Sequence, residues 1–238
     1  MPASLSLVHD DAAARPPFAP PSWTRPAQER VSADAGHGSA GRTLHFSPDS
    51  EIYADGDECQ SYYRVVSGVV RTCKFRSDGR RQIDAFYLPG EAFGFEAGAR
   101  HTLCAEAVSE AVVVAFRWRG QASLPDDARA AQDLFAEALN EMRRAQEHAL
   151  LLGRRSALQK VAAFVIDIVD RLSARQRRHD EDGVELAMSR QDIADYLGLT
   201  IETVSRTLSL LERDEAIALP AARRLRLVDR AALRAAAA

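Results

Sequence analysis

Two short amphipathic helices separated by one glycine constrain the fold of this 238-residue chain more than any other feature. Ser189 and Asp192 form a capping pattern at the start of the first helix, and Gly198 ends that helix where the backbone needs a positive φ. Thr200 caps a second helix, which runs over residues 201 to about 214. This order of caps, glycine and helices predicts a helix-turn-helix.

The contact between the two helices explains the residue types at their inner positions. Ala194 lets the helices cross closely, Gly198 makes the turn, and Val204 fills the crossing. The positions predicted to face inward are Ile193, Ala194, Leu197, Val204, Leu208 and Leu211.

The outer face of the second helix is polar near its N-terminus. Glu202, Ser205 and Arg206 are spaced i, i+3, i+4, so they form one patch at the end of the helix that reaches base edges in the major groove. Arginine can donate two hydrogen bonds to guanine O6 and N7, and glutamate can accept one from cytosine N4. The alternative is a solvated ion pair between Glu202 and Arg206. Within a helix-turn-helix we favour recognition of DNA bases.

A β-hairpin is predicted after the second helix, from residues 216–219, a Pro-Ala-Ala turn and residues 223–228. Its arginines are candidate contacts to DNA phosphates. The residues predicted to bind DNA are Arg190, Thr200, Glu202, Ser205, Arg206, Ser209, Arg223 and Arg224. From Arg154 onward the chain has 15 Lys and Arg against 13 Asp and Glu, a weak basic excess that is compatible with a nucleic-acid partner.

Short extended runs broken by turn residues occupy residues 43–118. The runs 62–66 and 69–73 flank a Ser-Gly turn, the run 82–87 follows a Ser-Asp-Gly turn, and the run 111–116 is almost wholly apolar. Many short strands at this spacing predict a β-sandwich or barrel.

A long helical pattern follows, in which apolar residues recur at alternating steps of three and four. Its members are Ala128, Ala131, Phe135, Ala138, Met142, Ala145, Ala149 and Leu152. So narrow an apolar stripe favours a parallel coiled-coil homodimer, with the positions from Ala131 onward in the interface. Packing of this stripe against the chain's own barrel is the alternative. Ser156 and Gln159 then form a capping box for the next helix.

These patterns divide the chain into four parts. They are a Pro- and Ala-rich tail at 1–42 that we expect to be disordered, a β-domain at 43–125, a dimerisation helix at 126–155 and a DNA-binding domain at 156–238.

No run approaches the roughly 18 apolar residues of a membrane-spanning helix, and no export signal opens the chain, so we expect a cytoplasmic protein without a membrane partner. Cys59, Cys73 and Cys104 are widely spaced, which predicts neither a disulfide framework nor a metal-binding pair. No nucleophile elbow, phosphate loop or Ser/His/Asp grouping occurs, so we expect no enzyme.

In this combination the chain resembles the CRP/FNR family of bacterial transcriptional regulators, from about Thr43 to Asp229. The matching stretches are Tyr53-Ala54-Asp55-Gly56-Asp57, Tyr63-Arg64-Val65-Val66-Ser67-Gly68, Leu88-Pro89-Gly90-Glu91-Ala92-Phe93-Gly94 and the helix-turn-helix. The resemblance implies an α+β fold with an N-terminal β-roll of the cyclic-nucleotide-binding type, a long dimerisation helix and a C-terminal winged helix-turn-helix. It also implies RNA polymerase as a partner.

Within that family, Glu202-Thr203-Val204-Ser205-Arg206 resembles the E-x-x-S-R pattern of the FNR and FixK branch. The cyclic-AMP receptor branch has R-E-x-x-x-R instead, and Ile201 stands where its first Arg would be. The resemblance implies a dimer that activates genes for low-oxygen metabolism from palindromes close to TTGAT, four unspecified base pairs and ATCAA. Two half-sites one helical turn apart suit a two-fold symmetric dimer.

The effector of such a regulator is a separate question. In the family's cyclic-nucleotide pocket an Arg for the phosphate is followed by a small hydroxyl, whereas this chain reads Gly98-Ala99-Arg100-His101-Thr102-Leu103. Gly90-Glu91 is present, but Arg100 is displaced. An FNR-type iron–sulfur cluster needs four thiolates, and the chain has three cysteines. We therefore expect no cofactor, as in FixK-type regulators. The alternative is a ligand-gated regulator whose β-roll binds a cyclic nucleotide, a haem through His101 or His45, or another small effector.

Overall fold

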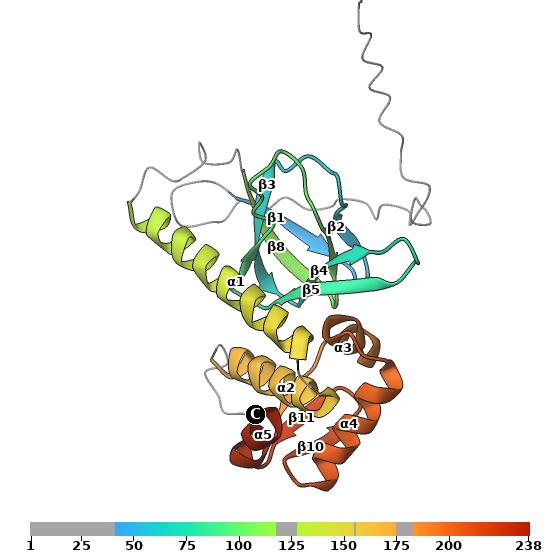
Figure 1. The fold of residues 1–238 in the computed structure, drawn as a ribbon. Helices are drawn as coiled ribbons and strands as arrows, with labels where there is room; N and C mark the ends of the chain where they lie inside the picture. Colours follow the sequence, from blue (N-terminus) through green and yellow to red (C-terminus); the bar gives the residue numbers. More distant parts are fainter. Residues whose placement is uncertain (1–40, 118–127, 155, 175–182) are drawn as a thin grey trace, which may run out of the picture.

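A computed structural model describes residues 41–117, 128–154, 156–174 and 183–238 (Figure 1). Almost all of the tail predicted to be disordered, residues 1–42, lies outside the described residues. The fold is α+β, with a β-roll, a long helix and a smaller C-terminal domain in chain order.

The β-roll contains two antiparallel four-stranded sheets, as the alternation of short runs and turns predicted. Their orders are β1-β8-β3-β6 and β2-β7-β4-β5. The strands are β1 (Arg42–Phe46), β2 (Glu51–Tyr53), β3 (Ser61–Ser67), β4 (Val70–Phe75), β5 (Arg81–Tyr87), β6 (Ala92–Phe93), β7 (Cys104–Ala107) and β8 (Ala111–Arg117). Apolar side chains from both sheets, among them Val65, Phe93 and Val113, are buried between them.

Helix α1 (Ala128–Arg154) runs from the β-roll to the C-terminal domain (Figure 1). The side of α1 that faces the β-roll is largely polar. Glu137 pairs with Arg64 at 2.7 Å, and Glu141 accepts a 2.5 Å hydrogen bond from the Tyr87 hydroxyl. Leu134 and Leu151 are the buried leucines of α1.

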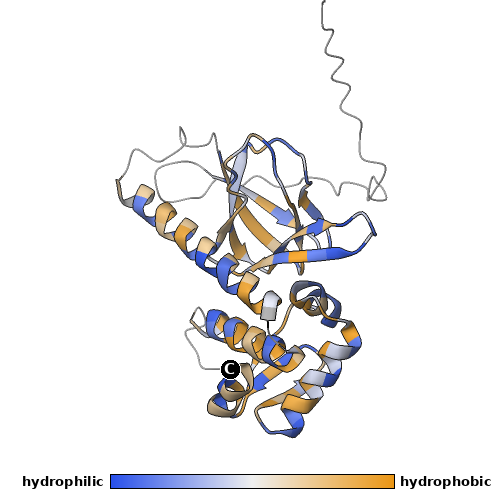
Figure 2. Ribbon diagram, in the orientation of Figure 1, coloured by the Kyte–Doolittle hydropathy of each residue, from blue (hydrophilic) through white to orange (hydrophobic). Residues whose placement is uncertain are grey.

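The predicted apolar stripe of α1 lies on its solvent side. Phe135 is 66% exposed and Met142 is 53% exposed, so these residues do not pack on the chain's own barrel, and that alternative is wrong for them. Figure 2 shows hydrophobic stretches along much of α1, in contrast to the hydrophilic end of the β4–β5 hairpin. Leu152 and Ala131 are half-buried, unlike the other members of the stripe, and Leu152 lies beside Gly198 of the helix-turn-helix.

The C-terminal domain packs four helices on a three-stranded antiparallel sheet of order β10-β11-β9. Its elements are α2 (Ala157–Ser173), β9 (Val184–Glu185), α3 (Arg190–Leu197), α4 (Ile201–Arg213), β10 (Ile217–Ala221), β11 (Arg224–Leu227) and α5 (Arg230–Ala237). Its core is continuous with apolar residues of the β4–β5 hairpin such as Ile83 and Phe86. The predicted capping box of Ser156 and Gln159 opens α2.

Helix α5 was not predicted. Asp229 caps it by accepting hydrogen bonds from the backbone N–H groups of Ala231 and Ala232, and the side chain of Leu233 is fully buried. An ion pair between Arg230 and Asp170 joins α5 to α2. The alanine-rich end of the chain therefore completes the core of the C-terminal domain.

Candidate DNA-binding interface

The turn between α3 and α4 is built by local hydrogen bonds. Asp192 Oδ2 accepts a 2.9 Å hydrogen bond from the backbone N–H of Ser189, and Ser189 Oγ accepts one from the N–H of Asp192. Gly198 ends α3 at φ 63°, and Thr200 Oγ1 accepts from the N–H of Thr203 at 3.2 Å. The predicted helix-turn-helix is confirmed, including its caps and its glycine.

The crossing of α3 and α4 excludes water, as the predicted inner positions require. Ala194 and Val204 are fully buried at the crossing, and Leu208 and Leu211 continue the inner face of α4. With one side of α4 packed in this way, the opposite side must face outward.

That outer side of α4 carries Glu202, Ser205, Arg206 and Ser209, and all four are exposed. The pKa of Glu202 is lowered by a backbone hydrogen bond, by the Thr200 hydroxyl and by the nearby charge of Arg206. Glu202 is therefore a carboxylate at neutral pH, an acceptor without a proton to donate. Glu202, Ser205 and Arg206 offer acceptor and donor groups within the first two turns of α4.

The other arginines predicted to contact DNA differ in their exposure to solvent. Arg223 and Arg224 are exposed at the β10–β11 hairpin. Arg190, at the start of α3, is half-buried, and burial lowers its pKa although the charge of Glu212 opposes that shift. Arg226 was missed as a candidate. It is exposed, and because side chains alternate along a strand it shares a face of β11 with Arg224, a spacing that was visible in the sequence.

A buried charge network ties α3 to the β-roll. Arg71 on β4 donates to Asp192 at 3.0 Å and to Glu106 on β7 at 2.7 Å. Arg81 on β5 donates to Asp192 at 2.6 Å and to Asp195 at 3.0 Å. The side chains of Arg71 and Asp192 are 5% and 6% exposed, so this pairing is shielded from water. We call Arg71, Arg81, Glu106, Asp192 and Asp195 the α3 network.

A second junction centres on Glu91, which lies just before β6. Arg171 of α2 donates to it at 2.7 Å, Arg144 of α1 donates at 3.1 Å, and the backbone N–H of Leu88 donates at 2.9 Å. Burial alone would raise the pKa of Glu91, but these hydrogen bonds and charges outweigh burial and lower it. Both carboxylate oxygens of the Gly-Glu motif are thus engaged within the protein.

The residues named as possible effector contacts do not gather into one site. Arg100 is exposed and donates to the Gly56 carbonyl at 2.6 Å. His101 is buried with its ring stacked 3.7 Å from that of Tyr53, while His45 is exposed on β1. With Glu91 paired to two arginines and Arg100 bonded to the β2–β3 loop, these residues do not fit a cyclic-nucleotide phosphate and ribose.

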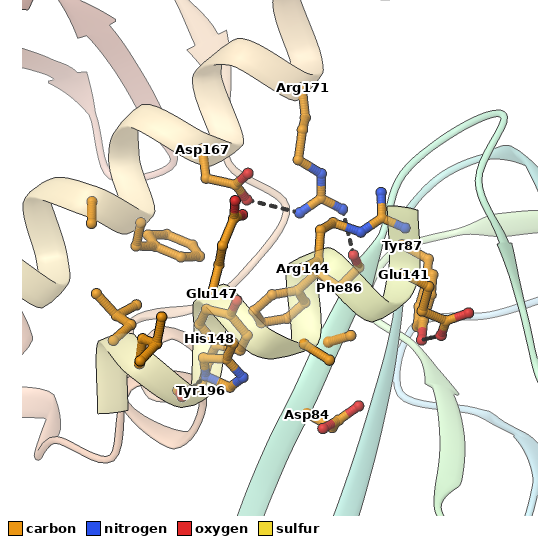
Figure 3. A pocket seen from close by; sticks show the side chains of 16 residues that line it. Asp84, Phe86, Tyr87, Glu141, Arg144, Glu147, His148, Asp167, Arg171 and Tyr196 are labelled. Carbon is orange, nitrogen blue, oxygen red and sulfur yellow. Dashed lines mark hydrogen bonds and ion pairs between the residues drawn. The ribbon is translucent and has the colours of Figure 1, made fainter. Parts of the chain in front are cut away.

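A cavity of about 360 Å³ lies where β5, α1, α2 and α3 meet (Figure 3). His148 stacks on Tyr196 with ring centroids 3.9 Å apart, and its Nε2 lies 2.8 Å from the Tyr196 carbonyl oxygen. Burial lowers the pKa of His148, although the hydrogen bond to Tyr196 and the charge of Asp84 oppose it. His148 therefore links α1 to α3 as a neutral ring.

Two family models match separate parts of the chain. Residues 43–123 match the model of the cyclic nucleotide-binding domain, and residues 159–236 match that of the Crp-like helix-turn-helix domain. Within the described residues, no helix is long and apolar enough to cross a membrane.

Relatives and solved structures point to one group within the family. The nitrogen fixation regulation protein FixK of Azorhizobium caulinodans is 51% identical over 190 residues, which cover 79% of this chain and 76% of that protein. FixK of Rhizobium meliloti is 44% identical over 189 residues, covering 79% and 84%. The structure of FixK2 from Bradyrhizobium japonicum, 40% identical, covers 83% of this chain and 98% of its own with a TM-score of 0.74. The chain therefore belongs to the FixK-like branch of the CRP/FNR family of transcriptional regulators.

Proposed function

We propose that this regulator binds DNA as a homodimer at palindromes close to TTGAT, four base pairs and ATCAA, with one α4 helix in each half-site. The main observation behind the proposal is the exposed polar face of α4. It lies near the N-terminus of the helix, which Thr200 caps, and on the side opposite the buried contact with α3. In helix-turn-helix proteins this end of the second helix contacts base edges.

The groups on α4 suit the half-site. Arg206 can donate two hydrogen bonds to guanine, and the Glu202 carboxylate can accept one from cytosine N4. Ser205 can donate or accept beside them. We assign Thr200, Ser209, Arg190, Arg223 and Arg224 to the DNA backbone, which fixes register without reading sequence. Arg190 differs from the other arginines of this set because it is half-buried.

The homodimer is proposed on the exposed apolar stripe of α1. Phe135 and Met142 are large apolar side chains that the chain itself leaves in water, and such patches mark interaction surfaces. The proposed interface is Ala131, Phe135, Ala138, Met142, Ala145, Ala149 and Leu152. Leu152 lies at its edge, because that side chain is half-buried beside Gly198. Two-fold symmetry then places two α4 helices on a palindrome.

The biological role follows from the relatives. Proteins similar to this chain include nitrogen fixation regulators, a transcriptional activatory protein and anaerobic regulatory proteins. We propose that this chain acts in the cytoplasm, contacts RNA polymerase and activates genes for low-oxygen metabolism. We further propose that it binds DNA without a cofactor or cyclic nucleotide, because Glu91 and Arg100 are engaged elsewhere.

Two duplexes test the DNA-binding proposal on the full chain. One carries the palindrome, and the other has the G·C pair of each half-site inverted. We expect the inverted duplex to bind at least tenfold more weakly, because each wrong base pair costs about 1–3 kcal/mol. Fluorescence anisotropy at fixed salt measures both affinities. Equal affinity for the two duplexes would remove the base-reading assignment.

Sedimentation tests the dimer separately. Phe135→Glu with Met142→Lys would bury unpaired charge in the proposed interface, so we expect a monomer that has lost operator binding. Asn140→Lys, at an exposed position on the opposite side of α1, is the matched control and should remain a dimer. A double variant that stays dimeric would place the interface elsewhere.

A further inference from the structure

Two of the three cysteines face each other across adjacent strands. Cys73 on β4 and Cys104 on β7 are directly opposed in the antiparallel register, and their Sγ atoms are 3.0 Å apart. Directly opposed residues have Cα atoms about 4.5–5.5 Å apart, which lies within the range of about 4.4–6.8 Å that a disulfide spans. The two sulfur atoms need to approach by only about 1 Å to reach bonding distance.

The hydrogen bonds distinguish the two thiols. The Cys104 thiol donates to the Cys73 carbonyl oxygen at 3.0 Å, so the hydrogen between the two sulfur atoms comes from Cys73. That bond lowers the pKa of Cys104, although burial opposes it, and raises the pKa of Cys73. Cys104 is 6% exposed, whereas Cys73 is fully buried. Cys104 is the thiol better placed to react first, because the thiolate is the nucleophile.

The surroundings of Cys73 and Cys104 suit a disulfide better than a metal ion. Cys73, Cys104 and Glu106 offer ligand atoms within 4.8 Å of one another. Glu106, however, accepts a 2.7 Å hydrogen bond from Arg71 and lies 3.6 Å from Arg81. Two guanidinium groups beside the carboxylate repel a cation, and structural zinc takes four protein ligands rather than three.

We propose that Cys73 and Cys104 form a reversible dithiol–disulfide site that a hydroperoxide oxidises. Cys104 loses its proton, its thiolate attacks one oxygen of hydrogen peroxide and the O–O bond breaks; the leaving hydroxide takes up that proton and departs as water, with Cys104 left as a sulfenic acid. Cys73 then attacks that sulfur, the S–O bond breaks, and a second water leaves as the S–S bond forms. The two thiols lose two hydrogen atoms in all, hydrogen peroxide is reduced to two waters, and an external dithiol reverses the reaction by exchange.

The two cysteines lie next to residues of the α3 network. Arg71 and Glu106 are also directly opposed, two residues from the cysteines on each strand, so the two pairs share a face of the sheet. The disulfide therefore forms directly beside the α3 network. In the cytoplasm, where we propose that this protein acts, the disulfides that do form are usually transient and catalytic or redox-sensing.

The test uses the full chain, reduced and then treated with hydrogen peroxide. Peptide mapping under non-reducing conditions should recover Cys73 linked to Cys104 within one chain, with a mass lower by two hydrogen atoms, and dithiothreitol should restore both thiols. Cys59→Ala should form the same link. Cys73→Ala should stop at a sulfenic acid on Cys104, which a dimedone adduct reports.

Three results would overturn the proposal. They are oxidation of Cys59 while the pair stays reduced, a link between chains, and zinc bound stoichiometrically through Cys73 and Cys104 that protects both. Peptide mapping of the wild-type chain distinguishes the first two results, and a zinc assay of the same chain reports the third. Neither measurement requires a cysteine variant to fold.

Discussion

Helices α3 and α4 meet at one glycine and use the same kind of cap, yet their outer faces have opposite surroundings. The carboxylates of α3, on Asp192 and Asp195, are bonded to arginines of the β4–β5 hairpin. The polar side chains of α4, such as Glu202 and Arg206, are exposed. The charges on α3 thus orient the C-terminal domain against the β-roll, whereas the charges on α4 are left accessible to a partner.

The largest effect is expected at the crossing that both helices share. Val204→Asp would bury an unpaired carboxylate, so the free energy of unfolding of the C-terminal domain should fall by about 4 kcal/mol or more. Ser205→Asp, the exposed neighbour on the same helix, should change it by less than about 0.5 kcal/mol. Urea denaturation followed by circular dichroism measures both. Equal losses would mean that the crossing does not stabilise the domain.

The next effect concerns α3 alone. Arg71→Met would remove the most buried arginine of the α3 network and leave Arg81 as the remaining arginine beside Glu106 and Asp192, at a cost of about 3 kcal/mol in unfolding free energy. Arg80→Met, 84% exposed on the same hairpin, should be nearly neutral. Hydrogen exchange should speed up in α3 for the first variant only. Both variants should keep the preference among DNA sequences. Loss of that preference in Arg71→Met would show that the charged face of α3 and the DNA-binding face of α4 do not act independently.

The third prediction concerns α4 and the hairpin beside it. Arg206→Ala should weaken binding by about 1–3 kcal/mol per half-site and relax the preference at the guanine, with stability unchanged because the side chain is exposed. Arg224→Ala should weaken all sequences alike and reduce the salt slope by about one unit. Binding-site selection at two salt concentrations separates them. Uniform weakening by Arg206→Ala would make Arg206 a phosphate contact.

The smallest effect is a pH dependence on the α3 side. Burial holds the pKa of His148 below its ordinary value of about 6.5, so the folded state disfavours the charged ring. The resulting stability is complete above about pH 6.5 and is lost as the pH falls toward the folded pKa. His148→Gln should flatten the stability profile in this window, while His45→Gln, exposed on β1, should not. Identical profiles for both variants would contradict the role of His148.

Local features could be predicted from the sequence, and long-range pairings could not. The caps at Ser189 and Thr200, the turn at Gly198 and the alternating strands depend on residues within a few positions of one another, so their patterns identify them. The resemblance added the order of the domains. The apolar stripe on α1 could also be identified from the sequence, because helical spacing places the exposed Phe135 and the buried Leu134 on different sides of the helix.

The rest depends on register and docking, which spacing does not encode. Arg71 and Asp192 look like unrelated surface charges until β4 and α3 are brought together. The wide spacing of the cysteines in the sequence did not reveal that strand register places Cys73 opposite Cys104, 31 positions away. Helix α5 escaped notice because its Ala-rich sequence carries a single large apolar residue, Leu233, which α2 helps to bury.

The separation of 121 positions between Arg71 and Asp192 also orders events during synthesis. At about 5–20 residues per second, Asp192 leaves the ribosome roughly 6 to 24 s after Arg71. By then β4, β5 and β7 have all been synthesised, so the strands that carry Arg71 and Glu106 are available to pair before α3 exists. Asp192 then makes two contacts with one carboxylate, the cap of α3 and the ion pair with Arg71.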